Sequence, residues 1–283
     1  MPMYDVENIR RDFPMLNGNV TNDGHPLVYL DSSATALKPQ CVIDAVNDFY
    51  TYYSTNTHRA DYQLAGIADN HYEAARTKVA RFINAQSREI CFTAGDTAAL
   101  NTIAYGLGEM VIKPGDVILS DLTEHASNVL PWFRLCEKKG AEIRYIPLEK
   151  SGRISLEGFK ALMNEKVKIV AVTAMSNVLA MPNPVSKIAE IAHQYGAYVV
   201  VDGAQSLPHM RTDVKEMGCD FLSASGHKLC GPTGVGILYG RYELLEAMEP
   251  LLLGGGANAR FHSNREVVLK HAPYKFEAGT MMI

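Results

Sequence analysis

The chain has 283 residues, of which 47% are hydrophobic and 20% are charged, and its formal net charge is −4. This composition is that of an ordinary globular protein, and the slight excess of acidic residues argues against nucleic acid as a main partner. No apolar run approaches the roughly 20 residues that span a bilayer, and the first 14 residues lack the apolar core of a secretory signal, so we expect no membrane partner and a cytoplasmic location.

The cysteine pattern gives no sign of a metal site or a disulfide framework. The five cysteines are an odd number, and they form no CxxC pair and no Cys/His cluster with zinc-ligand spacing. We therefore expect reduced and mostly buried thiols at Cys41, Cys91, Cys136, Cys219 and Cys230.

The first third of the chain predicts an arm followed by two helices. Residues 1–28 are typical of an N-terminal arm that leads into a strand near 28–30. Pro39 marks the start of a helix, after which apolar residues recur at helical spacing. A second helix is predicted over about 65–83, and its expected buried stripe is Ala74, Ala75, Val79 and Phe82.

From residue 89 onward, predicted strands and helices alternate. Strands are expected at 89–93, 117–120, 143–146 and 167–173, and helices at 97–110, 126–139, 155–163 and 185–195. Strands that alternate with helices of this length imply crossover connections. We therefore predict an α/β fold with a mainly parallel sheet and helices on both faces.

The stretch from Tyr198 to Gly236 carries the strongest chemical signal. One apolar run ends in Asp202, and a second run, Phe221-Leu222, leads into Lys228. An amine and a carboxylate at one sheet edge suit pyridoxal phosphate, because the lysine can hold the aldehyde as a Schiff base and the aspartate can keep the pyridine nitrogen protonated. Taken singly, a lysine is usually a solvated charge and an aspartate after a strand is usually a helix cap. The position of Lys228 between an apolar run and a glycine-rich turn favours the cofactor interpretation.

Polar residues also follow the other predicted strands. Thr97, His125, Asn177 and Asp202 each come after a different strand. In parallel sheets the ligand lies beyond the carboxyl ends of the strands. We therefore expect these side chains to converge on one rim.

The segments VDGAQ (201–205) and SGHKLCGPTGVGILYG (225–240) resemble the cofactor-lysine region of the class V aminotransferase family, and within it the SufS-type cysteine desulfurases. Other matching segments occur in the family's order, namely YLDSSAT (29–35), EHASNVLPW (124–132), SNVL (176–179) and KFEAGT (275–280). The resemblance covers nearly the whole chain. It implies that residues 29–283 form the large domain of a fold-type-I transferase dependent on pyridoxal 5′-phosphate (PLP).

The resemblance assigns roles to the residues on the rim. It implies that Lys228 holds the cofactor and then moves the Cα proton of the substrate as general base and acid. It pairs Asp202 with the pyridine nitrogen, and it gives Asn177 and Gln205 hydrogen bonds to the phenolic oxygen of the ring. His125 matches the histidine that stacks on the ring and can shuttle protons.

The resemblance also names the residues that hold the phosphate. They are Thr97, Ser225 and His227, together with Thr280 from the partner subunit of a homodimer. The start of the helix at Thr97 would add free backbone N–H groups and the positive end of the helix dipole. Without the family context, Thr97 is equally well explained as a simple helix cap.

The sequence departs from the family pattern at several points. Asp96 replaces the first threonine of a glycine–threonine–threonine turn, and at about 5 Å an ionised carboxylate would oppose each phosphate charge by roughly 3 kcal/mol at a dielectric near 20. We therefore expect Asp96 to point away and cap the helix. Ala174 and Ala180 replace a histidine and a glycine, and Met281-Met282 replace proline and asparagine.

The implied activity is conversion of L-cysteine to L-alanine, with the sulfur passed to an enzyme cysteine as a persulfide and onward to an acceptor protein for iron–sulfur cluster assembly. In relatives the nucleophilic cysteine lies in a small C-terminal domain, and none of the five cysteines here resembles it. We therefore expect cofactor binding with little or no turnover by this chain alone. Two alternatives stay open: another class V enzyme, such as an aminotransferase or a selenocysteine or cysteine lyase, and a non-catalytic homologue.

Overall fold

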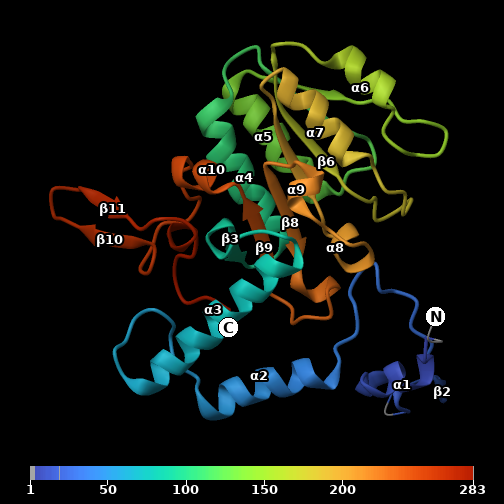
Figure 1. Ribbon diagram of the computed structural model, residues 1–283, viewed down its shortest axis with the longest axis vertical. Coiled ribbons are helices and arrows are strands. Elements are labelled where there is room, and N and C mark those ends of the chain that lie inside the picture. Colours follow the sequence, from blue (N-terminus) through green and yellow to red (C-terminus); the bar gives the residue numbers. More distant parts are fainter. Residues whose placement is uncertain (1–3, 19, 283) are drawn as a thin grey trace.

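A seven-stranded sheet forms the centre of the molecule in the computed structural model, which describes residues 4–18 and 20–282 (Figure 1). The strand order is β3-β9-β8-β7-β6-β4-β5. Strands β4 to β8 pair in parallel, whereas β9 is antiparallel to both of its neighbours, β3 and β8. The strands are β3 (Ile90–Thr93), β4 (Val117–Ser120), β5 (Glu142–Tyr145), β6 (Val167–Thr173), β7 (Tyr198–Asp202), β8 (Phe221–Ser225) and β9 (Gly236–Gly240). The prediction of a mainly parallel sheet is confirmed.

Helices cover both faces of this sheet, as predicted (Figure 1). One face packs against α4 (Asp96–Val111), α5 (Leu130–Lys139) and α10 (Tyr242–Ala247). The other face packs against α6 (Leu156–Leu162), α7 (Val185–Gln194), α8 (Ser206–His209) and α9 (Val214–Met217). The predicted boundaries of α4, α6 and α7 agree with the structure to within one residue, and the helix predicted at 126–139 divides into a 3-10 turn, η3 (Ala126–Asn128), and α5.

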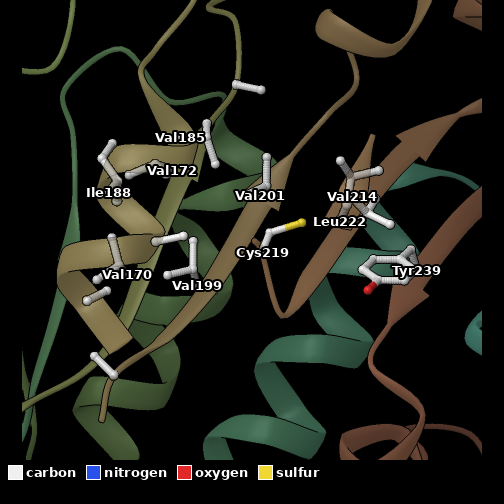
Figure 2. Close-up of a cluster of buried hydrophobic side chains, with 14 of the residues drawn as sticks. Val170, Val172, Val185, Ile188, Val199, Val201, Val214, Cys219, Leu222 and Tyr239 are labelled. Atoms are coloured by element: carbon white, nitrogen blue, oxygen red, sulfur yellow. The ribbon is translucent and has the colours of Figure 1, made fainter. Parts of the chain in front are cut away.

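Each central strand is buried on both faces, which explains its continuous apolar run. In β7, Val199 and Val201 belong to the cluster under α7, while Val200 belongs to the cluster under α4. Figure 2 shows the first cluster, in which Val199 and Val201 lie beside Val170 and Val172 of β6. Because side chains alternate between faces, a strand with helices above and below needs apolar residues at every position.

The prediction of a first strand near residues 28–30 is wrong. The described N-terminal segment instead contains helix α1 (Val6–Arg11), a 3-10 turn η1 (Pro14–Leu16) and a short hairpin of β1 (Thr21–Asn22) and β2 (His25–Pro26). Val28 and Leu30 are 76% and 90% exposed, because the described chain offers no neighbouring strand to this segment.

Two further helices, α2 (Gln40–Tyr52) and α3 (Gln63–Phe82), confirm the predicted helices but not the predicted buried face of α3. Ala74, Ala75 and Phe82 are exposed, and Val79 is half-buried. The buried residues of α3 are Ala65, Ala68, Tyr72, Arg76 and Ala80. Arg76 can be buried on this face because it forms an ion pair with Glu277 (2.7 Å).

The remaining described elements lie outside the central layers. A hairpin of β10 (Asn258–Phe261) and β11 (Val267–Leu269) projects from the body, and a 3-10 turn, η5 (Tyr274–Phe276), returns the chain toward α3 (Figure 1). All five cysteines are free, and three of them are buried. In the described ranges, no helix combines the length and the apolar character needed to cross a bilayer.

Candidate active site

A cavity that is open to solvent, with about 400 Å³ of empty space counted out to its mouth, lies at the carboxyl ends of the parallel strands. Its lining includes seven of the nine site residues predicted from the sequence: Thr97, His125, Asn177, Asp202, Gln205, Ser225 and Lys228. The structure therefore brings together side chains that come from five separate chain segments. His227 and Thr280 are not among the lining residues.

Asp202 and Lys228 come from neighbouring strands. Asp202 ends β7 and is 3% exposed, and its Oδ1 accepts a hydrogen bond from the backbone N–H of Ala204 (2.9 Å). Burial raises the pKa of Asp202, while the Ala204 N–H group and the charges of Lys228 and His125 act in the opposite direction. Lys228 ends a 3-10 turn, η4 (Gly226–Lys228), directly after β8. The two side chains thus place an amine and a buried carboxyl on one cavity.

The N-terminus of α4 forms another wall of the cavity. Gly95 precedes the helix with φ +142°, and a Cβ added at Gly236 of β9 would lie 2.4 Å from the Gly95 carbonyl carbon. The helix start therefore lies against the sheet because β9 has no side chain there. The Asp96 N–H donates to Ser225 Oγ (3.1 Å), which ties this turn to the end of β8.

His125 and Thr97 meet through Ser127. Thr97 Oγ1 lies 2.8 Å from Ser127 Oγ, and His125 Nδ1 accepts from the Ser127 N–H (3.2 Å). Because Nδ1 is an acceptor, the neutral imidazole carries its proton on Nε2. Ser127 therefore sets the orientation of the histidine and links it to the start of α4.

Gln205 and His227 both contact the segment 29–35. Gln205 Nε2 donates to the Ser33 carbonyl (2.7 Å), and His227 Nδ1 lies 3.1 Å from Thr35 Oγ1. Burial and the charges of Lys228 and Lys38 lower the pKa of His227. The predicted contact of His227 with a phosphate remains a prediction, since its ring lies against Thr35.

Asn177 lies in a turn between β6 and α7. Ser176 Oγ accepts from the N–H groups of Val178 and Leu179 (3.3 and 3.4 Å), which holds the turn. Ala180 follows with φ +53°, a left-handed conformation that favours glycine. The glycine that the family resemblance expects at this position therefore has a conformational reason.

Thr280 is exposed and its Oγ1 accepts a hydrogen bond from Asn56 Nδ2 (3.3 Å). It lies outside the cavity lining of its own chain. Its expected contribution to the site of a partner subunit is a prediction that a single chain leaves untested.

The expectation that Asp96 caps α4 and points away from the site is wrong. The N-cap is Gly95, and Asp96 is the first helical residue, 6% exposed and part of the cavity lining. Its Oδ1 has no hydrogen-bond partner among the residues that the structure describes. The helix starts one residue earlier than the capping interpretation requires, and so the carboxyl group faces inward.

Five lining residues were not predicted as site residues: Asp96, Ser127, Thr173, Met175 and Ala204. Thr173 pairs in register with Asp202, so its position at the end of β6 was a usable signal. Ser127 lies within the EHASN segment, two residues after His125, and Met175 and Ala204 follow strands that were predicted correctly.

The donor set fits a cofactor that carries an aldehyde, a basic ring nitrogen and a phosphate. Lys228 can bond to the aldehyde, Asp202 can pair with the nitrogen, and the hydroxyl groups of Thr97 and Ser225 lie at a helix N-terminus, where anions bind. The fold and the lining thus define an α/β protein of the fold-type-I class.

Comparison with known proteins gives the family. Residues 28–283 match the Aminotransferase class-V family. A probable cysteine desulfurase of Halalkalibacterium halodurans is 47% identical over 99% of this chain and 68% of its own length. The apo cysteine desulfurase of Thermococcus onnurineus superposes with a TM-score of 0.91 at 38% identity, over 99% of this chain and 67% of its own. The cysteine desulfurase CsdA of Escherichia coli, in an S-sulfonic acid form, superposes with a TM-score of 0.88 at 37% sequence identity, over 98% of this chain and 68% of its own.

The chain therefore belongs to the class-V aminotransferase family, as a cysteine desulfurase-like member, and its cofactor is PLP. It spans about two thirds of the length of the three relatives named above.

Proposed function

We propose that this chain acts on L-cysteine as the cofactor-binding part of a cysteine desulfurase. The observation that carries the proposal is the cavity that joins Lys228, Asp202 and the N-terminus of α4. When bound, PLP supplies an electron-accepting ring that stabilises negative charge at the Cα atom of an amino acid. The relatives named above are cysteine desulfurases, which favours cysteine as the amino acid.

Three residues of the cavity would have different roles in the reaction. Lys228 Nζ would hold the aldehyde carbon and, once displaced by the substrate amine, take the Cα proton and return it. Asp202 would keep the ring nitrogen protonated, aided by the hydrogen bond from Ala204 and by the charge of Lys228. His125 Nε2–H, fixed by the bond at Nδ1, would be free to donate to a ligand.

The sulfur acceptor is the part of the reaction for which the cavity offers no group. Among the described residues, no cysteine lines the cavity, and Cys91, Cys136 and Cys219 are buried. Desulfuration needs a thiol that attacks the substrate sulfur, so that the C–S bond breaks, the thiol becomes a persulfide and Cβ takes a proton to give alanine. We therefore propose that a thiol from outside the cavity, on an acceptor protein or another segment, completes the reaction.

The test starts with the lysine. Lys228→Ala and a matched surface variant, Lys215→Ala on α9, are incubated with PLP, reduced with borohydride and mapped by mass spectrometry. We expect the wild type and Lys215→Ala to carry the adduct on Lys228 and the Lys228→Ala variant to lose it. An unmodified Lys228 peptide in the wild type would refute the site.

Turnover is then measured with L-cysteine and an added dithiol. We expect alanine release to depend on the added thiol, because the cavity supplies none. Without added thiol, a rate that rises with the square of a low L-cysteine concentration would mark a second substrate molecule as the acceptor. Alanine formed at the undiminished rate and in proportion to L-cysteine would show an acceptor within the chain. Transfer of the amino group to a keto acid would instead indicate an aminotransferase, and an adduct without any turnover would indicate a non-catalytic homologue.

We also propose that the chain forms a homodimer in the cytoplasm. Leu251, Leu252 and Leu253 are exposed (40%, 65% and 71%), an apolar run that favours an interface. Thr280 lies outside its own cavity, which suits a role in the site of a second copy.

Sedimentation of Leu252→Glu tests the dimer, and Val267→Glu on the β10–β11 hairpin is the matched control. We expect Leu252→Glu to be monomeric and Val267→Glu to remain dimeric. A monomeric wild type would refute the proposal.

A further inference from the structure

Among the described lining residues, Asp96 is the one ionisable group to which the cofactor assignment gives no role. It is the first residue of the 16-residue helix α4, is 6% exposed and lines the cavity. Its Oδ1 is buried without a hydrogen-bond partner among the described residues. A buried oxygen without a partner is costly, so this atom is positioned either to carry a proton or to meet a ligand.

The ionisable groups around Asp96 come from each wall of the cavity. They are Asp202 at the end of β7, Lys228 after β8 and His125 before η3, with Glu124 close enough to Asp202 to respond to its charge. Among the described lining residues, Lys228 is the one lysine or arginine. If both aspartates ionise, two carboxylates face the one lysine of the described lining before any cofactor enters.

Burial and the negative charge of Asp202 raise the pKa of Asp96 to about 7, against the opposing effects of the nearby Ser223 hydroxyl and of the charge of Lys228. Asp202 is the carboxyl that the ring nitrogen needs in its ionised form. The pKa of Asp202 is raised as well, but the Ala204 N–H donates to its Oδ1 and favours the ionised form, whereas Asp96 Oδ1 has no such bond among the described residues. Of the two aspartates, Asp96 is therefore the one that holds a proton near neutral pH.

We propose that Asp96 makes the site selective for the phosphorylated cofactor in a proton-dependent way. In its protonated form Asp96 is a neutral hydrogen-bond donor at the helix N-terminus, and PLP binds with its phosphate there. When Asp96 ionises, its charge opposes the phosphate and the affinity for PLP falls. Pyridoxal, which has the same aldehyde and ring nitrogen but no phosphate, is indifferent to this change. The inference rests on the PLP site described above. It adds the residue that makes the site discriminate between PLP and pyridoxal.

The test compares two ligands and three proteins. Dissociation constants of PLP and pyridoxal are measured from pH 6 to 8.5 for the wild type, Asp96→Asn and Asp96→Thr. The single tryptophan, Trp132, can report binding through its fluorescence, and equilibrium dialysis checks the values. Dividing each wild-type constant by that of Asp96→Asn at the same pH cancels the titration of the phosphate and of the lysine.

For PLP we expect this ratio to rise roughly thirtyfold between pH 6 and 8.5, because a group with a pKa of about 7 loses its proton over that range. For pyridoxal we expect the ratio to stay near one throughout. Asp96→Thr, which keeps a hydroxyl donor without a charge, should behave as Asp96→Asn does. Circular dichroism confirms that the variants are folded.

A second measurement needs no variant. Calorimetry of the wild type at pH 8, in buffers with different ionisation enthalpies, counts the protons taken up on binding. We expect PLP to take up about one proton more than pyridoxal does.

Three outcomes would overturn the inference: a PLP ratio that does not change with pH, an equal rise for pyridoxal, or equal proton uptake by both ligands. An equal rise for pyridoxal would mean that Asp96 acts on Asp202 and not on the phosphate. If neither ligand binds to any of the proteins, the cofactor site itself fails, which is a result distinct from the other three.

Discussion

Two buried carboxyl groups in this protein have opposite surroundings. Glu277, in the segment that returns the chain to α3, accepts from Arg76 Nη1 and the Phe92 N–H at Oε1 (2.7 and 2.8 Å), and from Arg76 Nη2 and the Tyr72 hydroxyl at Oε2 (2.9 and 3.1 Å). Asp96 has a buried Oδ1 without a partner and faces a second carboxyl group, Asp202. Glu277 thus has hydrogen-bond donors within the fold at both of its oxygens, whereas Asp96 Oδ1 can gain a partner only from a proton or a ligand.

The comparison separates buried charge that joins elements from buried charge that serves a site. Burial acts to lower the pKa of Arg76, but the hydrogen bonds and charge of Glu277 outweigh it and raise that pKa. The ion pair therefore stays charged and connects α3, β3 and the segment after η5. At Asp96 burial prevails, and the carboxyl group titrates near neutrality.

The largest expected effect comes from breaking the satisfied pair. Arg76→Met leaves the Glu277 carboxylate buried without its cation, and the loss of one partner from a buried pair typically costs about 3–5 kcal/mol. Urea unfolding of the variant should show this loss of unfolding free energy. A loss below about 1 kcal/mol would mean that the connection between α3, β3 and the segment after η5 does not depend on the ion pair.

A smaller effect, of opposite sign, is expected for Asp96→Asn without cofactor. Because the pKa of Asp96 is raised from its usual 3.8 to about 7, the ionised form is disfavoured in the folded state. The folded wild type therefore loses stability as the pH rises from about 4 to 7, by up to about 4 kcal/mol.

Thermal unfolding in the absence of cofactor measures this difference. Asp96→Asn should be more stable than the wild type at pH 8, and the two proteins should converge toward pH 4. A variant that is less stable at pH 8 would show that the Asp96 carboxylate has a partner after all.

The smallest expected change in unfolding free energy tests how much a single hydrogen bond to Glu277 contributes. Tyr72→Phe removes one of the four hydrogen bonds to the carboxylate and leaves both bonds from Arg76. We expect a loss of about 1 kcal/mol in unfolding free energy, which is typical of one hydrogen bond. If the loss equals that of Arg76→Met, the hydroxyl and the guanidinium act as one unit.

Local pattern in the sequence predicted the sheet and the positions of Asp202 and Lys228 at the cavity, whereas Gln205 and Ser225 were expected there only from the family resemblance. Val199 to Val201 form an apolar run in a strand that is covered on both faces, and Asp202 is the next residue. Lys228 was found by its place between such a strand and a glycine-rich turn. Periodicity and strand ends were sufficient in these cases.

The errors occur where a distant partner decides the local structure. The buried face of α3 has regular helical spacing but includes Arg76, whose partner Glu277 lies 201 positions away in the sequence. A search for apolar residues alone therefore chose the wrong face. The segment of Val28 and Leu30 was predicted as a strand, but in the described chain it pairs with no other strand and both side chains are exposed. The inward position of Asp96 depends on a helix that begins one residue earlier than expected, at Asp96 with Gly95 as its N-cap.

The close approach of β9 to α4 has a consequence for how this protein can vary. A methyl group at position 236 would collide with the backbone of Gly95 rather than with a flexible side chain. The strand is held in register by neighbours on both sides, so the displacement would pass to the loop before α4 and tilt the first turn of that helix. A substitution at Gly236 would thus weaken the proposed binding of the vitamin B6 phosphate while the molecule still folds, and a defect that resembles poor cofactor supply would arise from one methyl group added on a neighbouring strand.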